Sequence, residues 1–326
     1  MISARQFKTS RRWLFLSFLL IYFVTGCFTS NESTSFEGAT TTTKAPQETA
    51  GEPPSPTIAV TYSVLAALVS DLVGNLANVV SVIPDGEDPH IYQPTESELQ
   101  VIRDSDFVVA NGLHFEAGLD GVLEEVRRDG KQIFYVIDHV TARFANDEAH
   151  SHDHDDGHNH GPVDLHLWMS PPTMRQMIPE LSLRLGELLG SDLQPSAERL
   201  VNELDELDTE IFRNLSNLEN CTILVNHDEF GYFSERYGCV SSSVSIPATA
   251  EEVNDTVATT IREAVQSAGV RAVFTNRMLS PELVEQITAA TDTKVVFVRT
   301  HSMGPSTRYT EFVQSIVDTI VSALAD

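Results

Sequence analysis

Apolar residues in most of this chain follow two alternating patterns, short β-rich runs and longer stretches with helical spacing. The runs Ile58–Val60, Val79–Ile83 and Phe107–Ala110 predict buried strands. Leucine and valine recur at helical spacing between the first two runs, and Thr95-Glu-Ser-Glu98 is a capping box that predicts the start of a second helix. Strands that alternate with helices favour parallel βαβ units with helices on both faces of a sheet.

This alternation is interrupted in the middle of the chain by two helical stretches. Pro171–Leu189 predicts one helix, and Pro195 suits the first turn of another, which continues for about 20 residues without a β-rich run. The strand and helix patterns then return. The remaining predicted strands are Ile133–Val136, Thr222–Val225, Val240–Ser245, Ala272–Thr275 and Val295–Val298. The remaining predicted helices are one ending at Tyr237, one capped by Thr249 and running to about Ala268, one from Ser280 and one from about Thr310.

These patterns predict an α/β protein of two lobes, each a mainly parallel sheet flanked by helices. The second of the two helices could link the lobes rigidly. The expected boundaries are 57–190 for the first lobe, 191–218 for the linking helix and 219–326 for the second lobe.

The first 56 residues read differently from this folded body. A basic stretch precedes the apolar run Trp13–Val24, which is too short to span a bilayer, since that takes roughly 20 residues. This pattern is typical of a secretory signal over residues 1–26. The ending Val24-Thr-Gly-Cys27 looks like a bacterial lipoprotein signal, with cleavage before Cys27 and a lipid on its sulfur; an ordinary signal peptide is the alternative. Residues 27–56 are rich in Thr, Ser and Pro and predict a disordered tether.

The charge of the chain argues against two kinds of partner. The formal net charge is −26, and removal of residues 1–26 would take away four basic residues and no acidic ones. A chain this acidic repels nucleic acid and anionic lipid head groups. It attracts cations, although solubility alone explains much of the charge.

A dense histidine run points to metal chemistry. Within residues 147–161, five histidines are interleaved with three aspartates: His150, His152, His154, His158 and His160. Imidazole is the commonest side-chain ligand for zinc, copper and nickel. We expect this His-rich loop to bind several metal ions weakly, and the alternative is a solvated acidic loop with no metal role.

Isolated histidines provide a better-defined candidate site. His90, His227 and His301 each follow a predicted strand, and His166 follows the His-rich loop. Ligands of open α/β sheets bind beyond the carboxyl ends of the strands, so these four could hold one metal between the lobes. Two weaker candidates also lie near strand ends, His114 and His139.

Three motifs around these histidines resemble those of a known family, the zinc/manganese solute-binding lipoproteins of bacterial ABC importers. The motifs are Asp88-Pro-His-Ile-Tyr-Gln-Pro94, Asp164-Leu-His-Leu-Trp168 and Asn226-His-Asp-Glu-Phe-Gly-Tyr232. The resemblance covers essentially all of residues 57–326, and a His-rich acidic insert before the second motif is carried by the zinc branch.

The resemblance implies one metal in the cleft, with His90 and His166 from the first lobe and His227 from the second. The chain departs from the family at the fourth ligand, which is commonly an aspartate after the last strands. His301 falls at that place, and Asn276 stands where many relatives have an acidic residue. Either His301 is the fourth ligand, or Glu229 or a water completes the site.

A site of four imidazoles favours zinc, which prefers tetrahedral nitrogen ligands, over manganese, which prefers carboxylate oxygen. The resemblance implies an extracytoplasmic receptor, not an enzyme, that captures Zn²⁺ and delivers it to an ABC permease. It would be a monomer, lipid-anchored to the bacterial cell membrane.

Two other functions suit the same residues. Three histidines and an open position could make an exported zinc hydrolase with Glu229 as general base, although the sequence lacks His-Glu-x-x-His and Gly-x-Ser-x-Gly. The third possibility is a metal-storage or adhesin lipoprotein without a transport partner.

Cys221 and Cys239 are the only cysteines after Cys27. In an exported chain they favour a disulfide over a redox pair, and two buried thiols are the alternative. Neighbouring parallel strands could bring them within bonding range.

Overall fold

The computed structural model describes residues 55–144, 163–247, 250–291 and 293–325. Two separate four-stranded sheets organise this part of the chain, and every strand pairing within them is parallel. The first sheet has the order β2-β1-β3-β4, with β1 Thr57–Val60, β2 Asn78–Ser81, β3 Phe107–Ala110 and β4 Ile133–Tyr135. The second has the order β6-β5-β7-β8, with β5 Thr222–Val225, β6 Val240–Ser243, β7 Ala272–Thr275 and β8 Lys294–Phe297.

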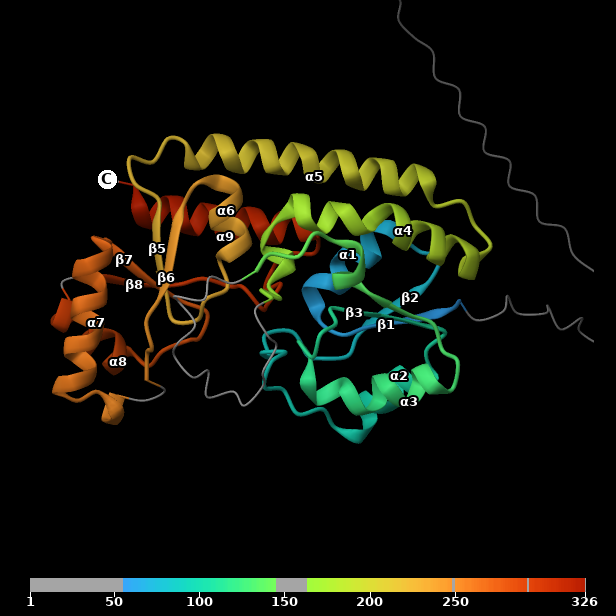
Figure 1. The fold of residues 1–326 in the computed structure, drawn as a ribbon, viewed down its shortest axis with the longest axis horizontal. Coiled ribbons are helices and arrows are strands. Elements are labelled where there is room, and N and C mark those ends of the chain that lie inside the picture. Colours follow the sequence, from blue (N-terminus) through green and yellow to red (C-terminus); the bar gives the residue numbers. More distant parts are fainter. Residues whose placement is uncertain (1–54, 145–162, 248–249, 292, 326) are drawn as a thin grey trace, which may run out of the picture. The chain divides into compact units, whose positions relative to one another are not determined.

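Helices cover both faces of each sheet (Figure 1). The sheet of β1–β4 packs with α1 Ser63–Val73, α2 Glu96–Asp104 and α3 Asp120–Arg128, and we call this group the N-lobe. The sheet of β5–β8 packs with α6 Gly231–Tyr237, α7 Asp255–Ala268 and α8 Pro281–Thr291, and we call this group the C-lobe. Within β1, Ile58 and Val60 face the core on the α1 side, while Ala59 faces α2 and α3. Single-residue alternation of this kind follows from the pleat of a strand.

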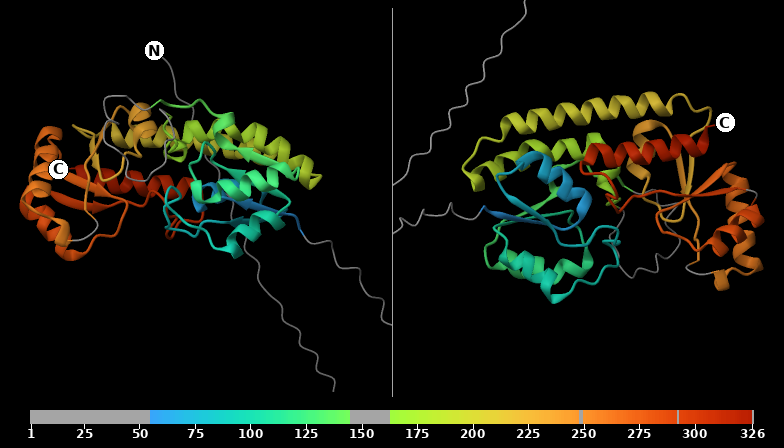
Figure 2. Two further views of the ribbon diagram at one scale, coloured as in Figure 1. Left: turned by 60° about the horizontal axis from the view of Figure 1, so that its bottom comes forward. Right: turned by 180° about the vertical axis from the view of Figure 1, so that it is seen from behind.

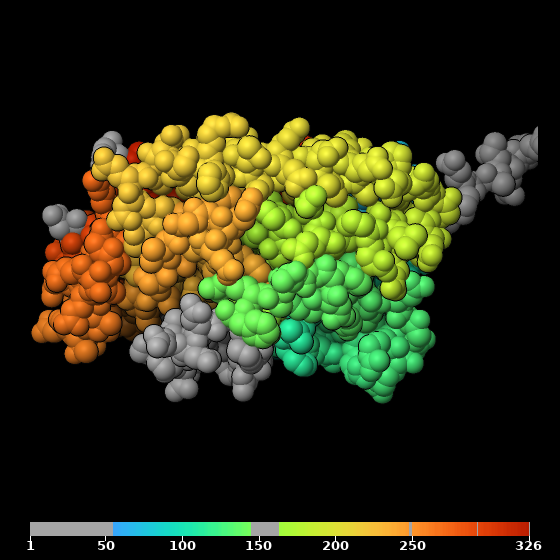
Figure 3. Space-filling view, turned by 45° about the horizontal axis from the view of Figure 1, so that its top comes forward, coloured from blue at the N-terminus to red at the C-terminus, as the bar shows by residue number. Residues whose placement is uncertain are grey.

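Beside the lobes run three long helices, α4 Pro171–Leu189, α5 Gln194–Leu215 and α9 Tyr309–Leu324, of which α5 and α9 connect the lobes. Helix α5 packs against α4 and α1 and also against α6 of the C-lobe. Helix α9 leaves the C-lobe sheet and packs against α5 and α1, and the two views of Figure 2 show α5 and α9 side by side. The space-filling view shows the side chains of α5 as a continuous band along one face (Figure 3). The predicted fold class, two parallel-sheet lobes with a linking helix, is therefore confirmed, and the lobe boundaries stay a prediction.

The ends of the helices follow the local sequence. Thr95 and Glu98 form the predicted capping box at the start of α2, in which each side chain accepts a hydrogen bond from the other residue's backbone N–H. Helix α4 begins with two prolines behind the cap Ser170 and ends at Gly190, whose left-handed φ of 59° suits a residue without a Cβ.

One helix prediction is wrong. The helix expected to run from Thr249 begins at Asp255, and Ala250–Glu252 forms a separate 3-10 turn. The side chain of Asn254 accepts hydrogen bonds from Thr256 N and Val257 N, at 3.0 and 3.1 Å. Asparagine is a strong N-cap, so the chain starts α7 there; Thr249 itself lies outside the described residues.

The predicted disulfide between Cys221 and Cys239 is confirmed. The parallel register pairs Thr222 of β5 with Val240 of β6, so the residue preceding each strand faces its counterpart. The two Cα atoms lie 4.7 Å apart, and the sulfurs are bonded. The bond ties the edge strand β6 to its neighbour at the amino ends of the strands.

Candidate metal site

Three histidines from distant parts of the sequence meet at one point. His90 lies in the loop between β2 and α2, His166 lies just before the short 3-10 helix Leu167–Met169, and His227 follows β5. One ring nitrogen from each residue lies within 4.8 Å of the other two. The Nε2 atom of His166 is 3.2 Å from that of His90 and 3.0 Å from that of His227. The structure thus brings together three of the four histidines that the sequence indicated.

Asp164 fixes the orientation and the tautomer of His166. The Oδ1 atom of Asp164 lies 2.9 Å from His166 Nδ1 and also accepts a hydrogen bond from the His166 backbone N–H at 3.0 Å. A carboxylate can only accept, so Nδ1 carries the proton, and the lone pair of a neutral His166 lies on Nε2. That lone pair points toward the other two rings. A cation placed among the three Nε2 atoms would therefore meet a donor already oriented for it.

The same carboxylate sets the charge state of His166. Burial alone would lower the pKa of His166, but the hydrogen bond and the negative charge of Asp164 hold it above its usual value. Burial would raise the pKa of Asp164, yet the bonds from His166 and the nearby Arg143 guanidinium keep it below its usual value. Both shifts favour a charged Asp164 beside an imidazole that is easily protonated.

Arg143 and Gly231 support this pair, and the sequence assigned a role to neither. Arg143 donates from Nη1 to Asp164 Oδ2 at 2.9 Å and lies against Glu235 of α6 at 3.1 Å. A Cβ on Gly231 would lie 2.3 Å from Asp164 Oδ2, so only glycine allows this approach. The Phe-Gly-Tyr signature marked Gly231 as part of a motif, but no local pattern marked Arg143.

Aromatic side chains make the surroundings of the histidines dry. The ring of Phe115 lies 4.6 Å from that of His90, and Trp168 lies 5.5 Å from His166. Both aromatic side chains are almost fully buried. A charge placed here is poorly screened by water, which strengthens its interaction with the nitrogen lone pairs.

His301 lies at the edge of the histidine cluster and not within it. Its ring centre is 6.5 Å from that of His227, and its Nε2 atom is 3.5 Å from Glu229 Oε2. Asn276, the other residue where the resemblance led us to expect an acidic side chain, donates from Nδ2 to Glu229 Oε2 at 3.3 Å. Within the described residues, His301 Nε2 and Glu229 Oε1 are buried and have no hydrogen-bond partner. Two atoms with lone pairs that could bind a metal therefore lie beside the three histidines. The identity of the fourth ligand stays a prediction.

Burial gives these two residues unusual pKa values. It lowers the pKa of His301 to about 4 and raises the pKa of Glu229 to about 7. His301 is consequently neutral at physiological pH and can offer a lone pair to a cation.

The weaker histidine candidates lie outside the cluster. The side chain of His114 is 71% exposed, and its Nδ1 atom lies 2.7 Å from Asp120 Oδ2. His139 stacks on Phe134 with ring centres 4.2 Å apart. The histidines of the His-rich loop and the lipidation candidate Cys27 lie outside the described residues. The loop's flanking residues Phe144 and Val163 form an antiparallel bridge next to Asp164.

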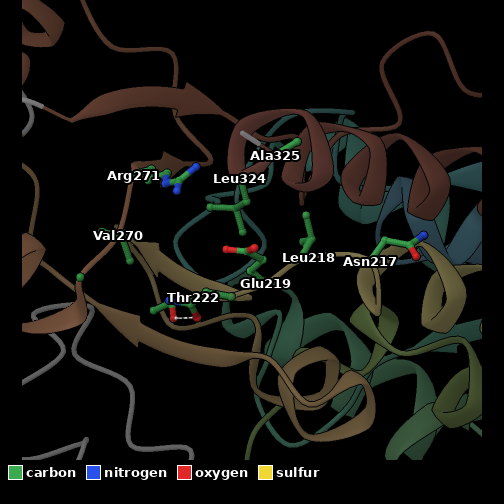
Figure 4. Close-up of a pocket in the computed structure, with 10 residues that line it drawn as sticks. Asn217, Leu218, Glu219, Thr222, Val270, Arg271, Leu324 and Ala325 are labelled. Carbon is green, nitrogen blue, oxygen red and sulfur yellow. Dashed lines mark hydrogen bonds between the residues drawn. The ribbon is translucent and has the colours of Figure 1, made fainter.

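A separate pocket of about 280 Å³ lies at the opposite end of the C-lobe sheet (Figure 4). Thr222 and Arg271 line it, and they stand at the amino ends of β5 and β7, whereas His227 follows the carboxyl end of β5. The pocket is therefore not part of the histidine site.

No helix in the described part of the chain is both long and apolar enough to cross a membrane.

Comparison with known proteins gives the family context of this geometry. Residues 58–323 match the sequence profile of the ZnuA family, described as zinc-uptake complex component A, periplasmic. The zinc-binding protein TroA of Treponema pallidum is 23% identical over 83% of this chain and 89% of its own length. The manganese-binding lipoprotein MntA of Halalkalibacterium halodurans is 23% identical over 82% of this chain and 88% of its own.

A solved structure is similar over the same region. The periplasmic zinc-binding protein TroA from Treponema pallidum superposes with a TM-score of 0.68 at 22% identity, covering 83% of this chain and 99% of that one. This likeness supports the two-lobe fold.

Proposed function

The chain belongs to the ZnuA family, and from that premise we propose that it is an extracytoplasmic receptor that captures Zn²⁺ and delivers it to an ABC permease. The observation that carries the proposal is the convergence of His90, His166 and His227, whose ligand atoms lie within 4.8 Å of one another. One relative is named for zinc and another for manganese, so the metal must be argued from the donors.

The donor set favours zinc. Three imidazole nitrogens match the tetrahedral nitrogen coordination of Zn²⁺, whereas Mn²⁺ prefers carboxylate oxygens and more ligands. Asp164 holds the most central imidazole in the ligating tautomer before any metal arrives. We propose His301 as the fourth ligand, with Glu229 or a water as the alternatives. Zn²⁺ is cargo here, so a closed shell suits the task better than the open position that a hydrolase needs.

The lobes should move little when zinc binds or leaves. Helix α5 packs on both lobes and α9 returns to α1, so a wide hinge opening would break these contacts. We propose that release involves small local changes around the cleft.

Two further proposals concern segments outside the described residues. Cys27 would carry the lipid that anchors the receptor, as a monomer, to the outer face of the cell membrane. The His-rich loop, His150, His152, His154, His158 and His160, would bind additional zinc weakly near the cleft. Deleting residues 147–161 should lower the metal stoichiometry and leave one tight site. Loss of the tight site would instead mean that the loop supplies a ligand to that site.

Calorimetric titration with Zn²⁺ and Mn²⁺ tests the assignment. The wild type should hold one zinc ion tightly and manganese much more weakly. His227→Ala should abolish tight binding, and His114→Ala, outside the cluster, should leave it unchanged. Tight zinc binding that survives His227→Ala would refute the site. Uptake of zinc by a reconstituted permease, dependent on this receptor, would separate a transport role from storage or adhesion.

Glu229 gives the hydrolase alternative its one specific support. Its buried carboxyl group has a pKa of about 7, which suits a general base. A zinc-loaded wild type that hydrolyses ester or amide substrates, with activity lost in Glu229→Gln, would favour that alternative over the receptor.

A further inference from the structure

A single carboxylate of the N-lobe holds the segment that follows His301. Asp85 lies in the loop after β2, and its Oδ1 atom accepts hydrogen bonds from Ser63 Oγ of α1 and from Met303 N, both at 2.7 Å. Its Oδ2 atom accepts from Ser302 Oγ at 2.8 Å and from Gly304 N at 3.4 Å. Three of these four donors belong to Ser302–Gly304, more than 200 positions away in the sequence.

The residue preceding His301 is also fixed from the N-lobe side. Trp168, which stands two residues after His166, donates from Nε1 to the carbonyl oxygen of Thr300 at 2.8 Å. His301 therefore sits between two fixed points, Thr300 and Ser302, although β8 delivers this segment from the C-lobe. Its ring lies 5.5 Å from that of Trp168. The N-lobe thus determines where the imidazole of His301 stands.

We infer that Asp85 is a positioning residue for the fourth ligand, which holds the Thr300–Gly304 segment so that His301 faces the three clustered histidines. The inference rests on the proposed function, because it takes His301 as a zinc ligand. Bonds to an ionised acceptor are about twice as strong as neutral ones, so Asp85 can fix the backbone of a short segment where an asparagine cannot. In Asp85→Asn one oxygen becomes an NH₂ group, which would face a donor from Ser302–Gly304 or Ser63.

If Asp85 only joins the lobes, its effect on zinc affinity should not depend on His301; if it positions His301, the effect should depend on that ring. A double-mutant cycle separates the two roles, because a purely structural effect persists when the His301 ring is absent. Asp85→Asn should weaken Zn²⁺ binding roughly tenfold in the wild-type background, the lower end of the loss seen when a ligand's support is removed. In the His301→Ala background the same exchange should change affinity by less than about twofold.

The chain offers a matched control on the same helix that carries Ser63. Asp71 of α1 pairs with Arg308 Nε at 2.9 Å, next to the start of α9, and this contact also joins the segment after β8 to the N-lobe. Asp71 bonds to none of residues 300–304 in the described structure. Asp71→Asn should therefore leave zinc affinity unchanged. Ser302→Ala, which removes one donor to Asp85, should give a smaller loss than Asp85→Asn.

The visible absorption of bound Co²⁺ gives a readout that a change in protein stability alone would not alter. This absorption is intense in a four-coordinate site and weak in a six-coordinate one. Co²⁺-loaded wild type should give the intense bands, and Asp85→Asn and His301→Ala should both reduce them. An equal loss of zinc affinity from Asp85→Asn in both backgrounds, or no loss in either, would overturn the inference while zinc binding by the three histidines stands. Zinc affinity unaffected by His301→Ala would overturn it too. Failure of the wild type to bind zinc would overturn the proposed function itself.

Discussion

The two lobes have the same strand order but contribute to the site in different ways. The N-lobe side brings His90 and His166, both 6% exposed, and holds His166 through Asp164. The C-lobe side brings His227 from the end of β5 and leaves buried atoms of His301 and Glu229 without hydrogen-bond partners in the described structure. We call the N-lobe side, where Asp164 holds His166, the fixed half; on the C-lobe side, His301 and Glu229 retain unused lone pairs.

This difference indicates two ways in which a buried site can bind an ion tightly. A ligand that is already oriented, as His166 is by Asp164, lowers the cost of ordering on binding, while unpaired buried groups raise the energy of the empty state. We expect metal binding to satisfy those groups, so the C-lobe half should respond most to occupancy. The predictions that follow test the two halves against each other.

The largest effect should come from removing a ligand of the fixed half. His166→Ala should weaken zinc binding by about three orders of magnitude, or about 4 kcal/mol, because the central nitrogen of the cluster is lost. His301→Ala should cost much less. Competition with a chelator of known affinity measures both. Equal losses would contradict the distinction between the halves.

The sequence indicated the three histidines that converge, His90, His166 and His227, because each lies in a short motif. The strand-end rule indicated His90 and His227, and it also indicated His301, which lies outside the cluster. Pro171–Leu189 and β5 also match their predicted bounds, because their apolar patterns are long or bounded by clear signals. These features are set by residues close together in the sequence, so a local pattern can reveal them.

What the sequence could not predict depends on distant contacts. Arg143 meets Glu235 of α6, 92 positions away, and Asp85 meets Ser302, 217 positions away, so no local pattern marks either residue. The position of His301 depends on that second contact. The mistaken start of α7 has a different cause: the side chain of Asn254 caps the helix, whereas the prediction took Thr249 as the cap.

The second prediction concerns stability and the C-lobe alone. The Cys221–Cys239 bond closes a loop with a sequence separation of 18, which in the chain-entropy model stabilises the fold by about 3 kcal/mol. The double variant Cys221→Ser, Cys239→Ser should lose that free energy of unfolding in urea. Its zinc affinity should hold, because the bond lies at the amino ends of the strands and His227 at the carboxyl end. Reduced wild type is the control, and a large loss of zinc affinity would show that the C-lobe transmits strain to the site.

The third prediction weakens the fixed half without removing a ligand. Asp164→Asn should reduce zinc affinity roughly 10- to 100-fold, the usual cost of losing a carboxylate that orients a ligating histidine. Gly231→Ala should act in the same direction, since its Cβ would displace the carboxylate of Asp164. Gly121→Ala is a matched control, because a Cβ there meets nothing within 4 Å. Unchanged affinity in Asp164→Asn would mean that packing alone orients His166.

The smallest effect is that of pH on zinc affinity, which can show that the proton competing with zinc binds in the half that contains His166. Only a neutral imidazole ligates zinc, and the pKa of His166 is raised above its ordinary value of 6.5, so its protonated fraction grows as the pH falls through that raised pKa. Zinc affinity should therefore be constant at high pH and fall by up to about tenfold per pH unit for each competing proton below the raised pKa.

The two halves should differ in this pH profile. The pKa of His301 is about 4, so its ring stays neutral throughout, and His301→Ala should lower the affinity without moving the pH at which it begins to fall. Asp164→Asn removes the group that raises the pKa of His166, so it should move that point to lower pH. Titrations between pH 5 and 8 measure both shifts. A wild-type zinc affinity that is constant over this range would rule out ligation by His166, because it would mean that protons do not compete with zinc for its ring nitrogen.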